Sequence, residues 1–280
     1  MFFQAGNGYP VSCTKGGLVM KSALLKSLLV LMCLTFLSLC SSLIAQEVAI
    51  YNDKSPAWID PVAMVLAAQK ALDAKSIKNN VVNAADLVTY MNANKTGVVI
   101  MATGIAPGEI FKNQGDKDLV RQWLTGGGIM LWTGDWPFYY WDVPANCPAA
   151  AGETSVFGVV VTAGTGSTNM TPTDLGKKLI PSIKEHTSQR PIMLKTLDSN
   201  KFNFESYADD GATYADPIAI QAPKMKGWFV NMHTWPENEA LDQVGKEMAE
   251  VIKNRFLVAP KAVDKMGKLT TTWGDVKANW

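Results

Sequence analysis

The sequence contains few of the side chains that bind transition metals. It has two histidines and four cysteines in 280 residues. The two histidines, His186 and His233, are far apart, and no pair of histidines or cysteines has the spacing of a zinc site. The sequence therefore predicts no metal site, and nothing in it indicates a cofactor.

The sequence also lacks a block of charge of one sign. Its 26 basic and 25 acidic side chains give a net charge of +1, and 18% of the residues are charged against 48% that are hydrophobic. Such a chain is too apolar to be disordered, so we expect it to fold. Without a Lys/Arg cluster, nucleic acid and anionic membrane surfaces are poor candidates for partners.

One long apolar run is present, but it is too short to span a bilayer. It lies within Leu24–Ile44, after Lys21, and its uninterrupted core of about a dozen residues falls short of the roughly 20 that a transmembrane helix needs. A basic flank before a short apolar core predicts a secretory signal peptide, with cleavage near Ala45 and Gln46. An uncleaved anchor is the alternative. Translation can begin at Met1 or at Met20, and the sequence does not decide between them.

A leader of residues 1–46, with the signal core at about 21–45, changes the composition of what remains. It holds three of the four cysteines and three lysines but no acidic residue, so the mature chain has a net charge of about −2 and one cysteine, Cys147. A disulfide framework is excluded, and a buried inert thiol is favoured over a reactive one. We expect a secreted or periplasmic protein that is not inserted in a membrane after cleavage.

The first half of the mature chain predicts strands and helices in alternation. Continuous apolar runs, such as Gly97–Ala102, are typical of parallel strands that are buried on both faces. Strands are predicted at Glu47–Asn52, Val81–Val82, Gly97–Ala102 and Ile129–Trp132, and helices at Pro61–Ala74, Ala84–Asn92 and Asp116–Thr125. This order predicts an α/β protein with a mostly parallel sheet and helices on both faces.

The second half is less regular. Residues of about 143–215 are rich in Pro, Gly, Ser and Thr, and we expect an irregular insertion there, with a strand at Val156–Thr162. Further elements are predicted at Leu175–Ile180 (helix), Ile192–Leu194, Ile218–Gln221 and Gly227–Met232 (strands), and Leu241–Phe256 (amphipathic helix). The domain would span 47–258, followed by a polar C-terminal tail at 259–280.

In this order the elements resemble the class I glutamine amidotransferase-like superfamily, which has a flavodoxin-like, three-layer α/β fold. Val98–Gly108 is similar to a strand and Gly/Pro-rich loop of that family. The hairpin Ile218–Met232 and the segment His233–Glu237 (His-Thr-Trp-Pro-Glu) stand where the family has a hairpin and a His-Pro-Glu motif. The resemblance covers most of the mature chain.

The catalytic motif of that family is changed in this sequence. Where the family has a Gly-x-Cys-x-Gly elbow, this chain has Leu131–Asp135 (Leu-Trp-Thr-Gly-Asp). Thr133 replaces the cysteine, and a hydroxyl is a far weaker nucleophile than a thiolate. The spacing from His233 to Glu237 is also two residues longer than in the family. The sequence therefore predicts a divergent member that has lost the glutaminase nucleophile.

The same segment carries a dense group of aromatic residues. Six aromatic residues lie within Trp132–Trp141, directly after a buried strand. Rings at the edge of a sheet either cover the core or stack against a ligand such as a sugar. The candidate ligand-binding residues are Trp136, Tyr139, Tyr140, Trp141 and Trp235.

The sequence thus favours an exported, non-catalytic binding domain whose ligand is a carbohydrate or a protein. The alternative is a divergent hydrolase that uses His233, Asp135, Thr133 and Glu237. In the predicted fold Thr133 and His233 both lie at the C-terminal edge of the sheet, where open α/β sheets bind ligands.

Overall fold

The computed structural model describes residues 47–52, 59–163, 166–234 and 240–257. The predicted leader and the predicted tail lie outside these residues, as do two of the candidate site residues, Trp235 and Glu237. Among the described helices, none has the length and apolar character needed to cross a membrane.

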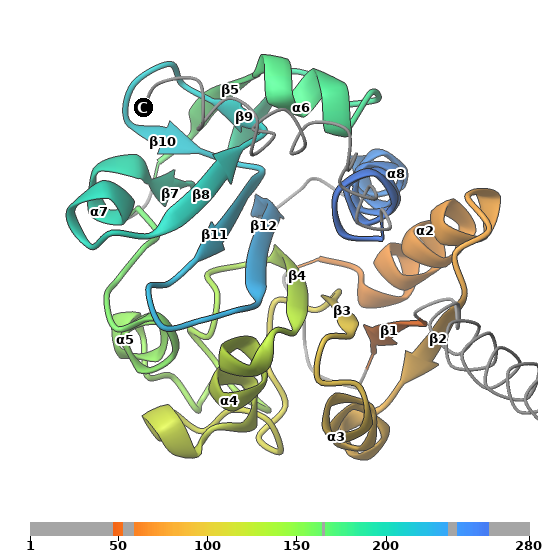
Figure 1. Ribbon diagram of the computed structural model, residues 1–280, viewed down its shortest axis with the longest axis vertical. Helices are drawn as coiled ribbons and strands as arrows, with labels where there is room; N and C mark the ends of the chain where they lie inside the picture. Colours follow the sequence, from red (N-terminus) through yellow and green to blue (C-terminus); the bar gives the residue numbers. More distant parts are fainter. Residues whose placement is uncertain (1–46, 53–58, 164–165, 235–239, 258–280) are drawn as a thin grey trace, which may run out of the picture. The chain divides into compact units, whose positions relative to one another are not determined.

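A seven-stranded sheet forms the centre of the domain, in the order β2-β1-β3-β4-β12-β11-β8 (Figure 1). The strands β2, β1, β3, β4 and β12 run parallel to one another. Strand β11 is antiparallel to both of its neighbours, β12 and β8. The parallel part has the 2-1-3-4-5 order of flavodoxin-like sheets. The predicted α/β class is therefore confirmed. The strand bounds are Val48–Tyr51 (β1), Asn79–Val82 (β2), Val98–Met101 (β3), Ile129–Gly134 (β4), Asn203–Ser206 (β8), Ile218–Gln221 (β11) and Trp228–Thr234 (β12).

The helices form a layer on each face of this sheet, because alternate strand residues point to opposite sides. Val98 and Ile100 face one apolar cluster with α2 and α8, while Val99 and Met101 face a second cluster with α3, α4 and α5. The result is the predicted three-layer arrangement. The helix bounds are Pro61–Ala74 (α2), Ala84–Ala93 (α3), Leu119–Gly126 (α4), Ala150–Phe157 (α5) and Leu241–Val251 (α8).

Local sequence signals account for where two of these helices begin. Asp60 caps α2 by accepting hydrogen bonds from the N–H groups of Val62 and Ala63, both at 3.0 Å, and Pro61 is the first helical residue. Asn83 caps α3 in the same way through the N–H of Asp86 at 2.9 Å. These caps explain why both helices match their predicted positions closely.

The segment of about 143–215 contains more regular structure than we expected. A second sheet has the strand order β6-β5-β9-β10-β7, with two short helices beside it. The prediction of a strand at Val156–Thr162 is wrong, because Val156 lies in α5 and only Thr162 forms an isolated bridge. The bounds are Thr168–Pro172 (β5), His186–Ser188 (β6), Ile192–Met193 (β7), Ala208–Asp209 (β9), Tyr214–Ala215 (β10), Asp174–Leu179 (α6) and Leu194–Ser199 (α7).

Helices α2 and α8 pack against each other at a glycine. A Cβ atom added to Gly245 of α8 would lie 2.6 Å from the carbonyl carbon of Ala67 in α2, closer than real Cβ contacts. The contact is with backbone, so no side chain can move aside to relieve it. Close approach of these helices therefore requires glycine at position 245.

We predict that Gly245→Ala destabilises the domain by about 1 to 3 kcal/mol, the usual cost of overpacking a core. Gly126→Ala is the matched control, because its added Cβ meets nothing within 4 Å. Alanine favours a helix over glycine, so the control should be neutral or stabilising by up to about 1 kcal/mol. Chemical denaturation of both variants measures the difference, and equal midpoints would contradict the prediction.

Candidate functional site

The C-terminal ends of β4 and β12 lie side by side and bring Thr133 and His233 together. The two strands are parallel, with Gly134 opposite Thr234 and a register shift between Asn231 and Thr234. The Thr133 hydroxyl donates a hydrogen bond to the backbone carbonyl of His233 at 3.0 Å. Thr133 is completely buried. The contact thus joins a hydroxyl to backbone and not to the imidazole.

The His233 imidazole points to helix α8. Its Nε2 lies 2.5 Å from Oε2 of Glu247, and both side chains are buried. Burial alone would lower the pKa of His233, but the hydrogen bond and the charge of Glu247 outweigh burial, so the pKa is raised above its ordinary value. His233 and Glu247 therefore form a buried, hydrogen-bonded pair.

A second buried carboxylate, Asp216, holds the backbone at this position. Its Oδ1 accepts the N–H of His233 at 2.9 Å, and its Oδ2 accepts the N–H of Thr234 at 2.9 Å. Oδ2 also accepts hydrogen bonds from the hydroxyls of Thr234 at 2.8 Å and Ser188 at 2.6 Å. His233 has a positive φ of 52°, which is unfavourable for a residue with a Cβ. The Asp216 hydrogen bonds stabilise that conformation.

His186 comes from β6 of the second sheet and packs on His233, with 4.0 Å between the ring centroids. Burial, followed by the positive charge of His233, lowers the pKa of His186. Its Nδ1 lies 3.1 Å from the carbonyl oxygen of Lys184, and its buried Nε2 has no hydrogen-bond partner among the described residues. The two histidines of the chain thus meet, and their pKa values are shifted in opposite directions.

Asp135 belongs to a different group of side chains from His233. One of its oxygens, Oδ1, accepts the N–H of Trp136 at 2.7 Å and lies 3.8 Å from Nε of Arg190. Burial raises the pKa of Asp135, opposed by these two contacts. No hydrogen bond joins the side chains of Asp135, Thr133 and His233 to one another among the described contacts, so the proposed catalytic residues are near one edge without forming a relay.

The aromatic run divides into a buried part and a half-buried part. Trp132 and Phe138 lie in the core, with ring centroids 4.9 Å apart. Trp141 packs edge-on against Phe111 at 6.2 Å. Trp132 and Phe138 therefore complete the core beneath the loop, and Trp141, which is partly buried, packs against that core.

Trp136, Tyr139 and Tyr140 form a half-buried row of rings, which we call the aromatic row. Trp136 stacks on Tyr139 with centroids 4.4 Å apart, and Tyr139 meets Tyr140 edge-on at 4.8 Å. The indole N–H of Trp136 donates to the carbonyl of Ala163 at 3.0 Å, and the Arg190 guanidinium lies 4.4 Å from the indole centroid. These contacts hold the row in one conformation.

A cavity of about 270 Å³ lies beside Trp136 and Tyr139 and is also lined by Glu153 and Thr162. The Glu153 carboxylate accepts the N–H groups of Val161 at 2.6 Å and Thr162 at 3.0 Å, as well as the Thr162 hydroxyl. Burial raises its pKa, although these hydrogen bonds oppose the shift. The cavity therefore has an aromatic wall and a carboxyl group that is already bonded to the protein.

Sequence reasoning missed Asp216, Glu247, Ser188 and Arg190. Of these, Glu247 had a visible signal, because it falls on the apolar face of α8 between Val244 and Val251. A charged residue on such a face needs a buried partner. No group of three or more His, Cys, Asp or Glu within the described ranges is arranged to hold a metal ion.

Comparison with known proteins finds similarity to solved structures, among them the following two. No family model and no curated protein matches the chain. A GMP synthase subunit from Thermoplasma acidophilum is 9% identical, with a TM-score of 0.36, over 74% of this chain and 94% of that one. The glutaminase domain of Trypanosoma brucei CTPS, with bound acivicin, is 9% identical, with a TM-score of 0.35, over 75% of this chain and 95% of that one. Similarity at this level assigns neither family nor activity.

We predict opposite effects of pH on stability through the two histidines. The folded-state pKa of His186 lies below its ordinary value of 6.5, so the unfolded chain binds a proton there more readily than the folded chain. The free energy of unfolding therefore decreases at this residue as pH falls below 6.5. The folded-state pKa of His233 is raised, so its contribution is complete below 6.5 and is lost as pH rises through the folded value. The His186→Gln variant cannot take up this proton, so its free energy of unfolding minus that of the unmodified chain should rise as pH falls from 7 to 5. Chemical denaturation of both proteins at a series of pH values measures this difference. A difference that does not change with pH would contradict this assignment.

We also predict that Asp216→Asn destabilises the domain by about 2 to 4 kcal/mol, because an amide replaces one acceptor oxygen with a donor in a buried site of four donors. Asp210→Asn is the control. Asp210 accepts hydrogen bonds from the N–H groups of Ala212, Thr213 and Tyr214, but it is exposed. The variant should therefore lose less than about 1 kcal/mol in the free energy of unfolding. Equal losses in the two variants would show that the Asp216 hydrogen bonds contribute nothing specific.

Proposed function

We propose that this chain is a non-catalytic binding domain and that it binds a carbohydrate through the aromatic row of Trp136, Tyr139 and Tyr140. The observation that carries the proposal is a contrast at one edge of the sheet. The polar groups suited to catalysis are buried and hydrogen-bonded to the protein, whereas the neighbouring rings are half-exposed.

The first half of that contrast concerns reactivity. A nucleophile must lie within hydrogen-bond reach of its base and must meet a substrate. Thr133 has no exposed surface and donates to a backbone carbonyl, while the His233 Nε2 is engaged by Glu247. A hydrolase that uses His233 with Thr133 or Asp135 has no support from these contacts.

The second half concerns recognition. The apolar face of a sugar ring stacks on aromatic side chains, and its hydroxyls need donors and acceptors close by. Tyr139 and Tyr140 provide both, since each offers a ring and a phenol hydroxyl. Burial raises the pKa of both tyrosines, helped by the charge of Asp135, so both hydroxyls stay protonated at neutral pH. A protein ligand would contact the same rings, and the phenol hydroxyls would matter less for its binding.

Export is the other part of the proposal, and it rests on the leader sequence alone. The basic flank and short apolar core before Ala45 are the supporting features. A secreted or periplasmic location would bring the domain into contact with glycans outside the cytoplasm. Mass measurement of the chain recovered from an exporting host would give the position of cleavage.

We predict that the double variant Tyr139→Ala, Tyr140→Ala loses at least about fivefold in affinity for a bound glycan, since stacking contacts are worth about 0.5 to 1.5 kcal/mol each. A glycan array on the purified domain identifies the ligand, and titration calorimetry measures the affinity of each variant. The matched control is Tyr139→Phe, Tyr140→Phe, which keeps the rings and removes the hydroxyls. It should lose less affinity than the alanine pair.

His233→Gln separates binding from catalysis. It should leave glycan affinity within about twofold, because the imidazole belongs to the buried pair with Glu247. If the domain binds no glycan on the array, the proposal that its ligand is a carbohydrate is wrong. Binding that is lost equally in His233→Gln and in the alanine pair would place the ligand elsewhere.

A further inference from the structure

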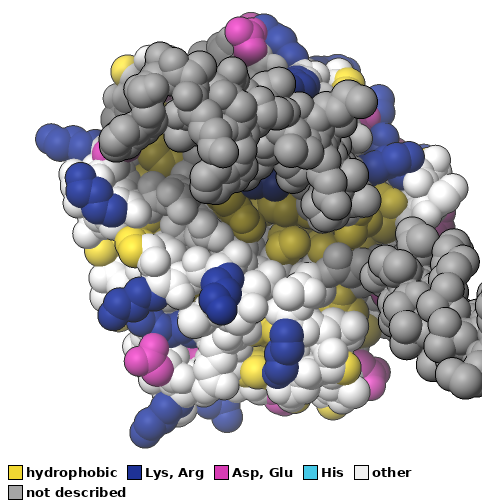
Figure 2. Space-filling model, viewed as in Figure 1, with side chains coloured by type: hydrophobic (Ala, Val, Ile, Leu, Met, Phe, Trp, Pro, Cys, Tyr) yellow, Lys and Arg dark blue, Asp and Glu magenta, His cyan; other side chains and the backbone are white. Residues whose placement is uncertain are grey.

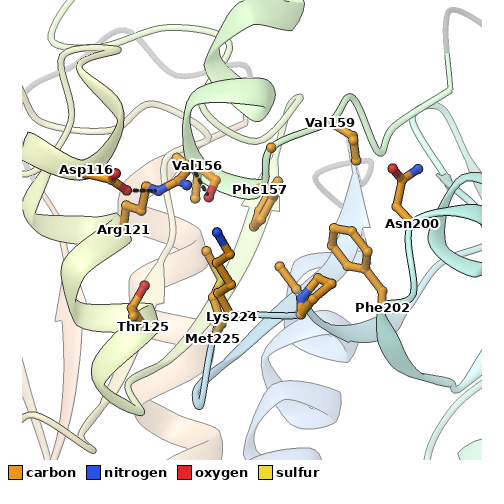
Figure 3. A pocket seen from close by; sticks show the side chains of 13 residues that line it. Asp116, Arg121, Thr125, Val156, Phe157, Val159, Asn200, Phe202, Lys224 and Met225 are labelled. Carbon is orange, nitrogen blue, oxygen red and sulfur yellow. Dashed lines mark hydrogen bonds and ion pairs between the residues drawn. The ribbon is translucent and has the colours of Figure 1, made fainter.

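A cavity of about 360 Å³ lies at the opposite end of the main sheet from the aromatic row. It opens where the β11–β12 turn meets the last residues of α4 and α5 and the residues just before β8 (Figure 3). A volume of this size is within the range of small-molecule sites, about 300 to 1,000 Å³. No residue of this cavity takes part in the proposed carbohydrate site.

The cavity has an apolar wall on two sides. Phe157 from α5 and Phe202 from the residues before β8 are nearly buried, at 6% and 7% exposure, and Met225 closes the wall from the turn. In Figure 3 these side chains come from separate segments of the chain and converge on the same space. The wall offers aromatic and thioether surface to the body of a ligand.

The negative groups around the cavity are already neutralised by Arg121. Its Nε lies 2.7 Å from the Asp116 carboxylate, and its guanidinium donates to the backbone carbonyls of Ser155 at 2.5 Å and Val156 at 3.2 Å. These carbonyls belong to the last turn of α5, which carries the negative end of the helix dipole. One cation therefore balances both the carboxylate and the end of the helix.

Lys224 adds a positive charge that nothing balances within the described residues. It lies in the β11–β12 turn and lines the cavity, and its ammonium has no described hydrogen bond or ion pair. Over the lower part of the face seen in Figure 2, Lys and Arg side chains stand apart from one another with few acidic side chains between them. Among the residues that line the cavity, Lys224 is therefore the cation without a described partner, and it lies beside an apolar wall.

We propose that this cavity binds a small organic anion with an apolar body, whose charged group lies beside Lys224 and whose body contacts Phe157, Phe202 and Met225. The positive charge of Lys224 favours a ligand with an anionic group, and the apolar wall favours a ligand whose remaining part is apolar. The proposal is independent of the carbohydrate site, because the two sites share no residue.

The test uses a pair of fluorescent probes that differ in charge. 1-Anilinonaphthalene-8-sulfonate carries an anionic group on an apolar body, and N-phenyl-1-naphthylamine is the same body without the sulfonate. Titration of the full chain should show saturable binding of the sulfonate. Lys224→Glu should weaken sulfonate binding about fivefold or more, which is roughly the loss of one favourable charge contact and the gain of one unfavourable contact. It should leave binding of the neutral probe within about twofold.

Lys226→Glu is the matched control, since Lys226 is exposed in the same turn and does not line the cavity. It makes the same change in net charge and should affect neither probe by more than about twofold. Phe202→Ala should weaken both probes, with circular dichroism to verify the fold. The Tyr139→Ala, Tyr140→Ala variant should bind both probes as the unmodified chain does, which separates this site from the carbohydrate site.

Three results would overturn the proposal. They are the absence of saturable sulfonate binding, equal weakening by Lys224→Glu and Lys226→Glu, and equal weakening of both probes by Lys224→Glu. The first excludes a site, the second excludes this location, and the third excludes selection for an anion.

Discussion

The buried carboxylate of Asp216 is the constraint on which the arrangement of this sheet edge depends. A charge removed from water is stable only when hydrogen bonds replace its hydration, and Asp216 receives four, from two backbone N–H groups and two hydroxyls. The donors come from the end of β12 and from Ser188 of the second sheet. One carboxylate therefore fixes the positive φ of His233 and also joins the second sheet to the main one.

The direction of the His233 side chain follows from that constraint. With its N–H bound to Asp216 and its carbonyl bound to the Thr133 hydroxyl, the residue has little freedom to rotate its backbone. The imidazole then meets Glu247 of α8 on one side and the His186 ring on the other. A histidine that looks available in the sequence is thus held inside the protein, and the neighbouring threonine is held with it.

The parallel sheet was predictable because its signals are local. Apolar runs of four to six residues mark strands buried on both faces, and Asp60 with Pro61 marks the start of a helix. The antiparallel partners of the second sheet have short strands with alternating burial and no such runs. Helix α5 was missed because Val156 and the residues after it have high strand propensity. The helix ends at Phe157, where Gly158 adopts the left-handed conformation with a φ of 88° and donates its N–H to the carbonyl of Thr154. The N–H groups of Val161 and Thr162 then bind the Glu153 carboxylate of α5, and these contacts override the strand propensity of the segment.

The candidate site was predictable only in part, for a related reason. The parallel order of β4 and β12 was enough to predict that Thr133 and His233 end at the same edge. Which atoms meet was not predictable, because that depends on Asp216 and Glu247, which lie 17 and 14 residues from His233 along the chain. Side-chain partners at such separations are set by how the elements pack and leave little trace in local sequence pattern.

The two ends of the sheet therefore differ in how their charges are used. At the C-terminal edge the buried carboxylates of Asp216 and Glu247 have partners in the protein. The proposed recognition there would therefore use rings and phenol hydroxyls, which suit a neutral, hydroxyl-rich ligand. At the other end, Arg121 neutralises the carboxylate and the end of α5, and Lys224 is left over beside an apolar wall. A ligand that brings its own negative charge completes that end, whereas a neutral sugar does not. The two sites should for this reason discriminate between ligands by charge, and neither should compete for the ligand of the other.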